Sequence, residues 1–351
     1  MNKKLIRAAA AILSAAQIML LLCGCYDNNE IDSLAQVVAL GVEPCGDENI
    51  RFTFAVADIG EFSSESDSGA KKSMRSFTAE STDIENAVMS VNSHISKQLN
   101  FAHMCIVVAS RMAACEYLGD IAEYLERNPD VRPQTLVTVS EISPGEYLEN
   151  AVTDMEVNPE KYFLNIFQKN RSYIPVMHLS DYTESLYCNT DCIAPVIKKG
   201  SSDNEFPTVG AALVHGGKLQ SDIAETSMLG LLKSTAAVPI EYNGEIMNVR
   251  SVQKPKYEAS LDGGHAYIRV HLTVESCDGK FSDSKYISEC MEKFLTERSA
   301  AGCDVFGFSG ITKKKFSDWS EYAAYDPEGS ITRTVYDVTT GIANGGGSND
   351  Y

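Results

Sequence analysis

Short strand-like runs alternate with amphipathic helical segments along the first half of the chain, and this alternation constrains the fold most. Residues 50–57 place Phe52, Phe54 and Val56 on one side, as expected for a strand with one buried face. Similar runs predict strands at residues 102–109, 135–139 and 192–198. Because strands and helices each have an apolar side that must be covered, the alternation indicates a sheet packed with helices.

The helices between these strands have recognisable start signals. Thr82 followed by Glu85 matches a capping box, and an apolar stripe follows it. The stripe consists of Ile84, Val88, Val91, Ile95 and Leu99. Ser143 before Pro144 predicts a second helix start, with Glu146 as the capping glutamate. Further helical segments are expected at residues 117–127, 159–168 and 180–187.

The second half of the chain is richer in strands. A polar stretch at residues 198–207 (KKGSSDNEFP) predicts a domain boundary. Residues 208–214 and a short strand after Gly217 predict a hairpin, and Asp222 and Glu225 are candidate caps for the next helix. Strands are then expected between residues 238 and 275, a helix over 284–298 and a last strand over 335–343.

Residues 1–31 have the pattern of an export signal that ends in a cysteine. The basic residues at its start are Lys3, Lys4 and Arg7. The apolar run 8–22 is shorter than the ~20 residues that span a bilayer, and it matches the apolar region of a secretory signal. The following sequence, Leu22-Cys23-Gly24-Cys25, resembles the lipobox of bacterial lipoproteins.

In signals of this kind the chain is cleaved directly before the cysteine, which then carries lipid. Cleavage is expected between Gly24 and Cys25, so that residues 1–24 are the signal peptide. The Cys25 thiol would hold a diacylglyceryl group as a thioether, and two acyl chains give stable anchoring. The alternative is an uncleaved anchor in which Cys23 and Cys25 are ordinary small apolar residues. The polar flank Tyr26–Glu30 favours lipidation.

Charge excludes some classes of partner. The 351 residues have a formal charge of −18, and removing residues 1–24, which hold three cations and no acid, lowers it to −21. A surface this acidic argues against nucleic acid as a partner, because phosphate backbones need a basic footprint. It also argues against a protein that lies flat on anionic lipid. The length allows two or three domains.

Eight cysteines remain after Cys23 and Cys25 are set aside. Their spacing resembles no disulfide framework, although an exported location permits disulfides. Cys105 and Cys290 are expected to be buried small apolar residues. Cys188 and Cys192 are the one local pair that predicts a bridge.

No catalytic or metal-binding motif is recognisable in the sequence. The six histidines show no metal-ligand pairing with nearby Cys or Asp, and His103 is expected to be packed or hydrogen-bonded at a strand start. No nucleophile elbow, P-loop or dinucleotide-binding glycine motif occurs. The sequence therefore predicts no catalytic residue, no cofactor and no metal site.

Four segments in order resemble the Ger(x)C (GerAC-like) family, the lipoprotein C subunits of spore germinant receptors. The first is Cys25-Tyr26-Asp27, where Tyr26 replaces the usual Trp. The second is His103 with the apolar run to Ala109, followed by IAEYLERNPD at residues 121–130. The third is the Gly- and Ala-rich hairpin from Gly210 to Leu231, and the fourth is Asp304–Phe308 followed by Trp319.

The resemblance implies an α+β fold of three successive domains, each a mixed or antiparallel β-sheet packed with helices. The expected divisions are a signal peptide (1–24), an N-terminal germination-protein region with two subdomains (25–200), a C-terminal germination-protein domain (201–345) and a flexible tail (346–351). It further implies a non-enzymatic subunit that works with a larger membrane subunit and a polytopic transporter-like subunit. Together they sense a nutrient at the spore inner membrane.

A second function class stays open from the sequence. It is a lipid-anchored, extracytoplasmic binding protein that captures a small ligand for a transporter. Such proteins normally have two similar α/β lobes, whereas the strand-rich second half here is unlike the first, which favours the receptor subunit. In either case Phe306, Phe308 and Trp319 are expected to cover the apolar face of helix 284–298.

Overall fold

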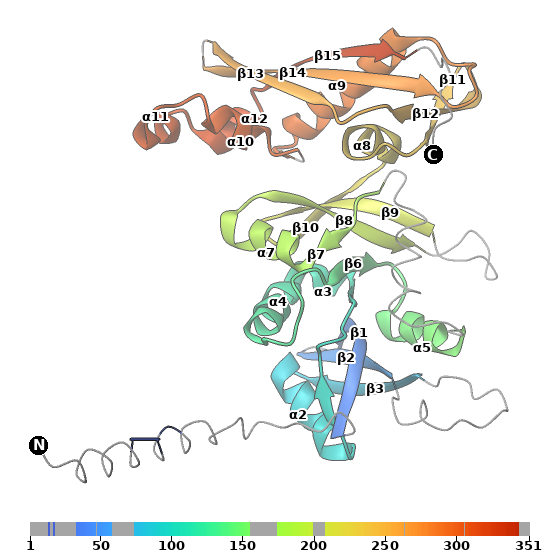
Figure 1. Ribbon diagram of the computed structural model, residues 1–351, viewed down its shortest axis with the longest axis vertical. Coiled ribbons are helices and arrows are strands. Elements are labelled where there is room, and N and C mark those ends of the chain that lie inside the picture. The colour runs from blue at the N-terminus through green and yellow to red at the C-terminus, as the bar shows by residue number, and fades with distance from the viewer. Residues whose placement is uncertain are drawn as a thin grey trace, which may run out of the picture.

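The structure is a computed structural model that describes residues 33–46, 48–57, 74–154, 174–198, 208–262, 264–304 and 306–343, with isolated residues at 13, 14 and 17. Two β-sheets with their helices are stacked along the longest axis (Figure 1). The strands of residues 34–81 lie at one end, and the sheet of residues 238–342 lies at the other.

The first sheet has ten strands in the order β10-β9-β8-β6-β5-β1-β2-β3, with β4 beside β1 and β7 beside β6. The strands are β1 (Leu34–Cys45), β2 (Asn49–Ala57), β3 (Met74–Ser81), β4 (Gln98–Asn100), β5 (Ile106–Ser110), β6 (Leu136–Ser140), β7 (Met177–His178), β8 (Asp191–Lys198), β9 (Thr208–His215) and β10 (Lys218–Ile223). Its centre, β1-β5-β6-β8, is parallel, and both flanks are antiparallel.

The parallel centre is buried on both faces, which explains its apolar runs. In β5, Val107 and Ala109 face one cluster of buried side chains, while Ile106 and Val108 face another. Successive side chains of a strand point to opposite faces, so a strand that is covered on both sides is apolar throughout.

Helices cover both faces of this sheet. Among the described elements, four helices pack on one face, and α5 (Pro144–Asp154) packs on the opposite face. The four are α2 (Ile84–His94), α3 (Arg111–Glu116), α4 (Leu118–Arg127) and α7 (Leu179–Cys188). The helix expected at residues 159–168 lies outside the described residues, and α3 was not expected at all.

One of the two predicted helix starts, at Ser143, is confirmed, and the other, at Thr82, is not. Ser143 caps α5 as expected, since its hydroxyl oxygen accepts from the Glu146 amide at 3.3 Å. The capping box at Thr82 is wrong, because Asp83 caps α2 and its carboxylate accepts from the Asn86 amide at 2.8 Å. Asp83 lies one residue closer to the helix than Thr82. Its ionised carboxylate is also a stronger hydrogen-bond acceptor at a helix N-terminus than a threonine hydroxyl. The stripe is also shorter than expected, because α2 ends at His94 and Leu99 belongs to β4.

The predicted hairpin of β9 and β10 is present, but it belongs to the first sheet. β9 pairs with β8 across the polar stretch 198–207, so these two strands are hydrogen-bonded neighbours on either side of the expected boundary. Gly217 forms the hairpin turn at φ +73°, where a side chain would also collide with Leu186.

The second sheet has five strands in the order β11-β12-β14-β13, with β15 parallel to β14. They are β11 (Val238–Tyr242), β12 (Glu245–Ser251), β13 (Lys256–Asp262), β14 (His265–Ser276) and β15 (Val335–Ile342). The accompanying helices are α8 (Thr226–Lys233), α9 (Ser284–Ala300), α10 (Phe308–Lys313), α11 (Trp319–Ala324) and α12 (Pro327–Ile331).

Helix α9 is present as predicted, and its apolar side covers one face of the second sheet. Its side chains Ile287, Met291, Phe294 and Leu295 are buried against the inward residues of β14 and β15. Ile193 and Leu213 from the first sheet join the same buried cluster, so the two sheets share a core through β8 and β9. The α+β class with mixed, helix-packed sheets is confirmed.

Candidate functional site

Cys25 and Gly24, the predicted lipidation and cleavage residues, lie outside the described residues. The described fold begins at Ser33 and enters β1 at Leu34, nine positions after Cys25. Within the described part of the chain, no helix is both long enough and apolar enough to cross a bilayer.

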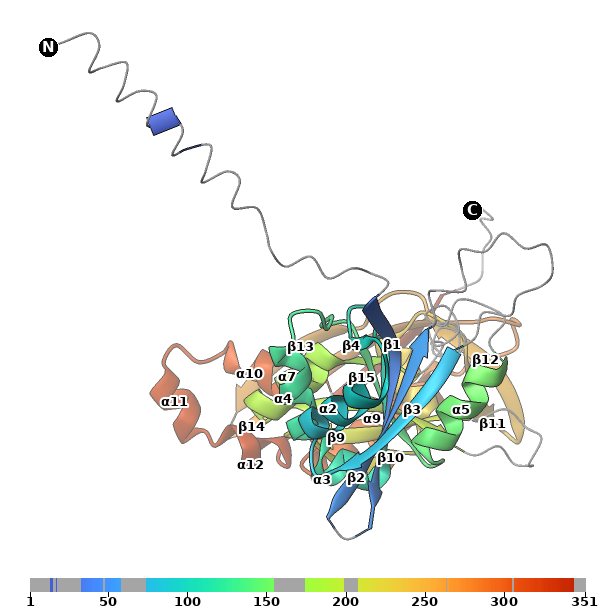
Figure 2. The same cartoon turned by 90° about the horizontal axis from the view of Figure 1, so that it is seen from below.

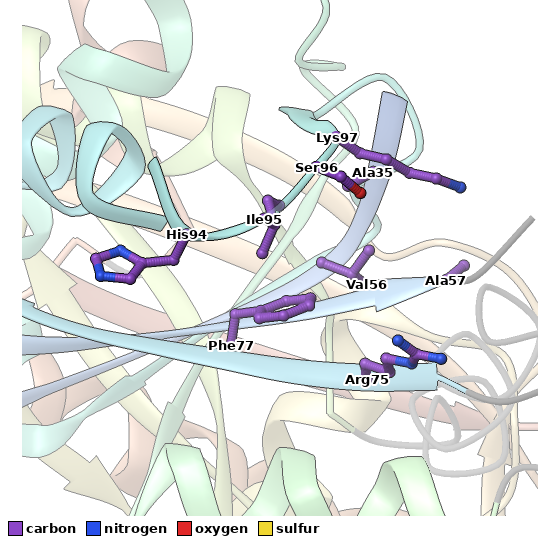
Figure 3. Close-up of a pocket in the computed structure, with 9 residues that line it drawn as sticks. All are labelled: Ala35, Val56, Ala57, Arg75, Phe77, His94, Ile95, Ser96 and Lys97. Carbon is purple, nitrogen blue, oxygen red and sulfur yellow. The ribbon is translucent and has the colours of Figure 1, made fainter. Parts of the chain in front are cut away.

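An open pocket of about 310 Å³ lies where β1 begins. Its walls come from β1, from the ends of β2 and β3, and from the residues that follow α2. Val56, Phe77 and Ile95 lie at its centre, and Arg75 and Lys97 extend beyond Val56 on one side (Figure 3). The register places these residues together, because Val56 pairs with Arg75 in the antiparallel ladder.

The pocket differs in charge from the rest of the molecule. The nine described residues that line it include Arg75, Lys97 and His94 and no acidic residue. The His94 ring lies on the side away from Arg75 (Figure 3), with Nδ1 2.7 Å from the Ser90 carbonyl oxygen. A carbonyl only accepts, so Nδ1 is the protonated nitrogen and Nε2 is the one left for another contact.

A second polar cluster joins the two sheets. Asp191 at the start of β8 has a side chain that is 2% exposed, and its carboxylate lies 2.7 Å from His215 Nδ1 in β9. The same carboxylate accepts from the backbone amide of Asp304, which follows α9. Burial raises the pKa of Asp191, and the hydrogen bonds from His215 and Asp304 oppose that rise. This cluster therefore ties the first sheet to the segment that precedes α10.

Asp304 and Lys233 belong to the same junction. The Asp304 carboxylate accepts from the amides of Phe308 and Ser309 at 2.6 and 2.8 Å, and so holds the start of α10. Lys233 Nζ lies 5.0 Å from the centre of the Phe306 ring. Burial lowers the pKa of Lys233, while the negative charge of Asp304 opposes that shift. These contacts are structural in character, because they join secondary elements rather than line a pocket.

The predicted aromatic cover of α9 is correct in part. Phe308 is buried, and Phe306 is half-buried against Phe294 of α9. Trp319 is 66% exposed on α11, at the edge of the molecule in Figure 2, so its assignment to the core is wrong. It packs instead on Tyr322, with Lys313 Nζ 4.7 Å from its ring centre.

Gly307 is required for its backbone rather than for close packing. Its φ is +69°, and a Cβ there would meet no atom within 4 Å. The left-handed conformation at the start of α10, and not a neighbouring side chain, is what favours glycine.

Several other sequence expectations change in the structure. Cys188 and Cys192 are both free, so the predicted bridge is wrong; the Cys192 sulfur instead lies 3.4 Å from the Met177 sulfur. His103 is exposed in a turn before β5 and is not packed. Cys105 is buried, as expected.

Asp222 is not a helix cap either. It lies in β10, where its carboxylate pairs with Arg111 of α3 at 2.5 Å and with Lys198 at 3.3 Å. Glu225 is the residue before α8, and its side chain forms no capping hydrogen bond. Among the described residues there is also no group of three or more His, Cys, Asp or Glu that could hold a metal.

Comparisons with known proteins point to one family. Residues 27–199 match the family model described as the spore germination protein N-terminal domain. The chain is 23% identical over 204 residues to spore germination protein KC of Bacillus subtilis strain 168, covering 56% of this chain and 49% of that protein. It is 24% identical over 275 residues to YfkR of the same organism, covering 74% and 70%. The match to protein KC thus spans about half of that relative.

A solved structure shows the same fold. The crystal structure of the GerBC protein superimposes with a TM-score of 0.53 at 12% identity, covering 90% of this chain and 100% of that one. The family model ends at residue 199, whereas the superposition covers 90% of the chain. It therefore includes both sheets.

Proposed function

The chain belongs to the GerAC-like family of spore germination proteins, and from this premise we propose that it is a lipoprotein subunit of a nutrient germinant receptor. In this role it is not an enzyme: it holds or couples other subunits at the membrane. The observation that carries the proposal is the family match directly behind a lipobox.

The proposed anchor is Cys25, carrying fatty acyl chains such as palmitate after cleavage behind Gly24. Nine positions separate Cys25 from Leu34, and extended chain spans at most ~3.3–3.6 Å per residue. The start of β1 therefore lies within ~30 Å of the lipid-bearing residue. The proposed location is the extracytoplasmic face of the spore inner membrane.

The proposed partners are a larger membrane subunit and a polytopic transporter-like subunit. The two sheets of this chain are unlike each other: the first is parallel at its centre, and the second is mainly antiparallel with one open face. A ligand-capturing protein for a transporter normally has two similar lobes, so the unequal pair favours the receptor subunit. The acidic composition gives no support to nucleic acid as a partner.

Replacing Cys25 tests the proposal directly. We expect Cys25→Ala to leave the chain unprocessed at Gly24 and without acyl groups. Alanine has no thiol that could accept the diacylglyceryl group. Cys23→Ala is the matched control and should be processed and acylated like the wild type. Membrane fractionation with mass spectrometry of the N-terminal peptide measures both. An acylated, fully membrane-bound Cys25→Ala protein would contradict the anchor.

A further inference from the structure

The pocket at the start of β1 has a chemistry that a subunit role alone does not explain. The formal charge of the chain is −18, yet among the described residues in the wall of this pocket the charged side chains are all basic. A concave site that is lined by one sign of charge concentrates the field and attracts the opposite sign. The pocket is therefore suited to an anion.

We propose that this pocket binds the headgroup of an anionic phospholipid. Its phosphate lies between Arg75 and Lys97, and its glycerol portion rests on Phe77 and Val56. Arginine offers a planar set of donors that matches phosphate, and lysine adds a compact charge. Both side chains also have an interaction within the folded chain. Five guanidinium donors and three ammonium donors allow a further acceptor at each.

The apolar centre and open form of the pocket favour a headgroup over a free metabolite. Val56, Phe77 and Ile95 form an uncharged floor beside the two cations (Figure 3). A site for a free small molecule buries most of its ligand. A headgroup stays joined to its acyl chains in the bilayer, so it needs a site that is open on one side and partly apolar.

The position of the pocket fits a membrane ligand. Ala35, the second residue of β1, forms part of the wall, and it follows Cys25 by ten positions. A lipid on Cys25 would thus keep the pocket within ~35 Å of the bilayer. The second sheet lies at the opposite end of the molecule (Figure 1). This placement rests on the proposed anchor, whereas the charge and form of the pocket do not.

The consequence is an orientation of the subunit on the membrane. An acidic protein is repelled by an anionic bilayer, so a lipid anchor at one residue would not by itself fix its orientation. A headgroup held by Arg75 and Lys97 fixes the β1–β3 end against the bilayer. The second sheet then points away from it, towards other subunits.

Lysine acetylation in the full chain tests the proposal. The protein is kept in micelles of an uncharged detergent with added phosphatidylglycerol, phosphatidylcholine or inorganic phosphate. Mass spectrometry compares the acetylation rate of Lys97 with that of Lys285, which is 85% exposed on α9 and serves as an internal control. We expect phosphatidylglycerol to slow acetylation of Lys97 several-fold and to leave Lys285 unchanged, with little effect of phosphatidylcholine.

A variant adds a second readout. Arg75→Gln should weaken the protection of Lys97 by phosphatidylglycerol about fivefold, the effect of one cation near an anionic surface. Arg250→Gln, the same change on the second sheet, should leave it unaltered. Equal protection by inorganic phosphate, or none by any addition, would overturn the proposal. Because Cys25→Ala can be assayed in the same micelles, failure of the pocket and failure of the anchor are distinguishable.

Discussion

The two sheets of this protein differ in how many of their faces are covered. In β6 of the first sheet all five residues are buried, whereas β14 of the second sheet alternates between buried and exposed residues. The first sheet lies between helices on both sides, and the second packs on α9 with its other face in solvent. A parallel sheet needs cover on both faces, and an antiparallel one does not.

The open face of the second sheet is a surface of paired charges and exposed apolar side chains. Arg269 bonds to Asp337 at 2.9 Å and lies 3.6 Å from Glu258 on the neighbouring strand. Tyr267 and Ile246 are exposed, at 40% and 71%. We therefore expect substitutions on either face of the first sheet to destabilise the protein. In the second sheet, only substitutions on the face that packs on α9 should do so.

The largest expected effect separates the two sheets. Phe54 in β2 is fully buried beside Phe52 and Phe101, so Phe54→Ala should lower the free energy of unfolding by about 3–5 kcal/mol. Tyr267→Ala on the open face should change it by less than about 0.5 kcal/mol. Chemical denaturation of the chain from Tyr26 onward measures both. Equal losses would show that the face of β14 bearing Tyr267 is covered.

The next comparison lies within the second half of the chain. Phe308 contacts Tyr257 and Tyr336 and is 3% exposed, so Phe308→Ala should cost about 3 kcal/mol. Trp319→Ala should cost less than about 0.5 kcal/mol, since its ring is mostly in solvent. If the tryptophan variant were the less stable of the two in urea, the exposed position of α11 would be wrong.

A smaller effect is expected at Gly307. Val there must adopt a left-handed backbone, which costs about 1–2 kcal/mol, although there is room for its side chain. Gly307→Asn should cost less, because asparagine tolerates this conformation better. Comparing the urea midpoints of the two variants separates a backbone cause from a steric one. Similar losses for both variants would indicate a steric limit rather than a backbone one.

The smallest effect concerns the junction between the sheets. Burial raises the pKa of Asp191 above its ordinary 3.8, so the folded chain binds this proton more tightly than the unfolded chain does. The contribution of Asp191 to stability therefore falls as pH rises from about 3.8 through the folded pKa. Asp191→Asn should lack this fall, so its stability relative to wild type should improve between pH 4 and pH 7. Denaturation of both proteins at several pH values checks this prediction. If the stability of Asp191→Asn relative to wild type fell between pH 4 and pH 7, the pKa of Asp191 would be lowered by folding rather than raised.

Local sequence patterns predicted most of the elements but not their pairing. Periodicity located β2, β6, β8 and α9, because each buries a regular set of side chains. It missed α3, whose six residues are too few to show a helical period. The domain boundary at the polar stretch between β8 and β9 stays a prediction, since a connection between two paired strands looks the same in sequence as a linker between domains.

The candidate site was the least predictable part. Arg75, Lys97 and Val56 come from three separate segments, and only the β2–β3 register and the end of α2 bring them together. Trp319 was assigned to the core because large aromatic residues are usually buried, but its helix extends beyond the sheets (Figure 2). Contacts between distant segments leave no local pattern, so only the fold reveals them.

Isolation of the protein from spore membranes tests its proposed role most directly. The tagged full chain and its Cys25→Ala variant would be cross-linked in dormant spores and purified in mild detergent, and the attached proteins identified by mass spectrometry. We predict that the wild type carries a larger membrane subunit and a polytopic transporter-like subunit of a germinant receptor, and that the variant loses them. Recovery of the anchored wild type with neither subunit would contradict the receptor role.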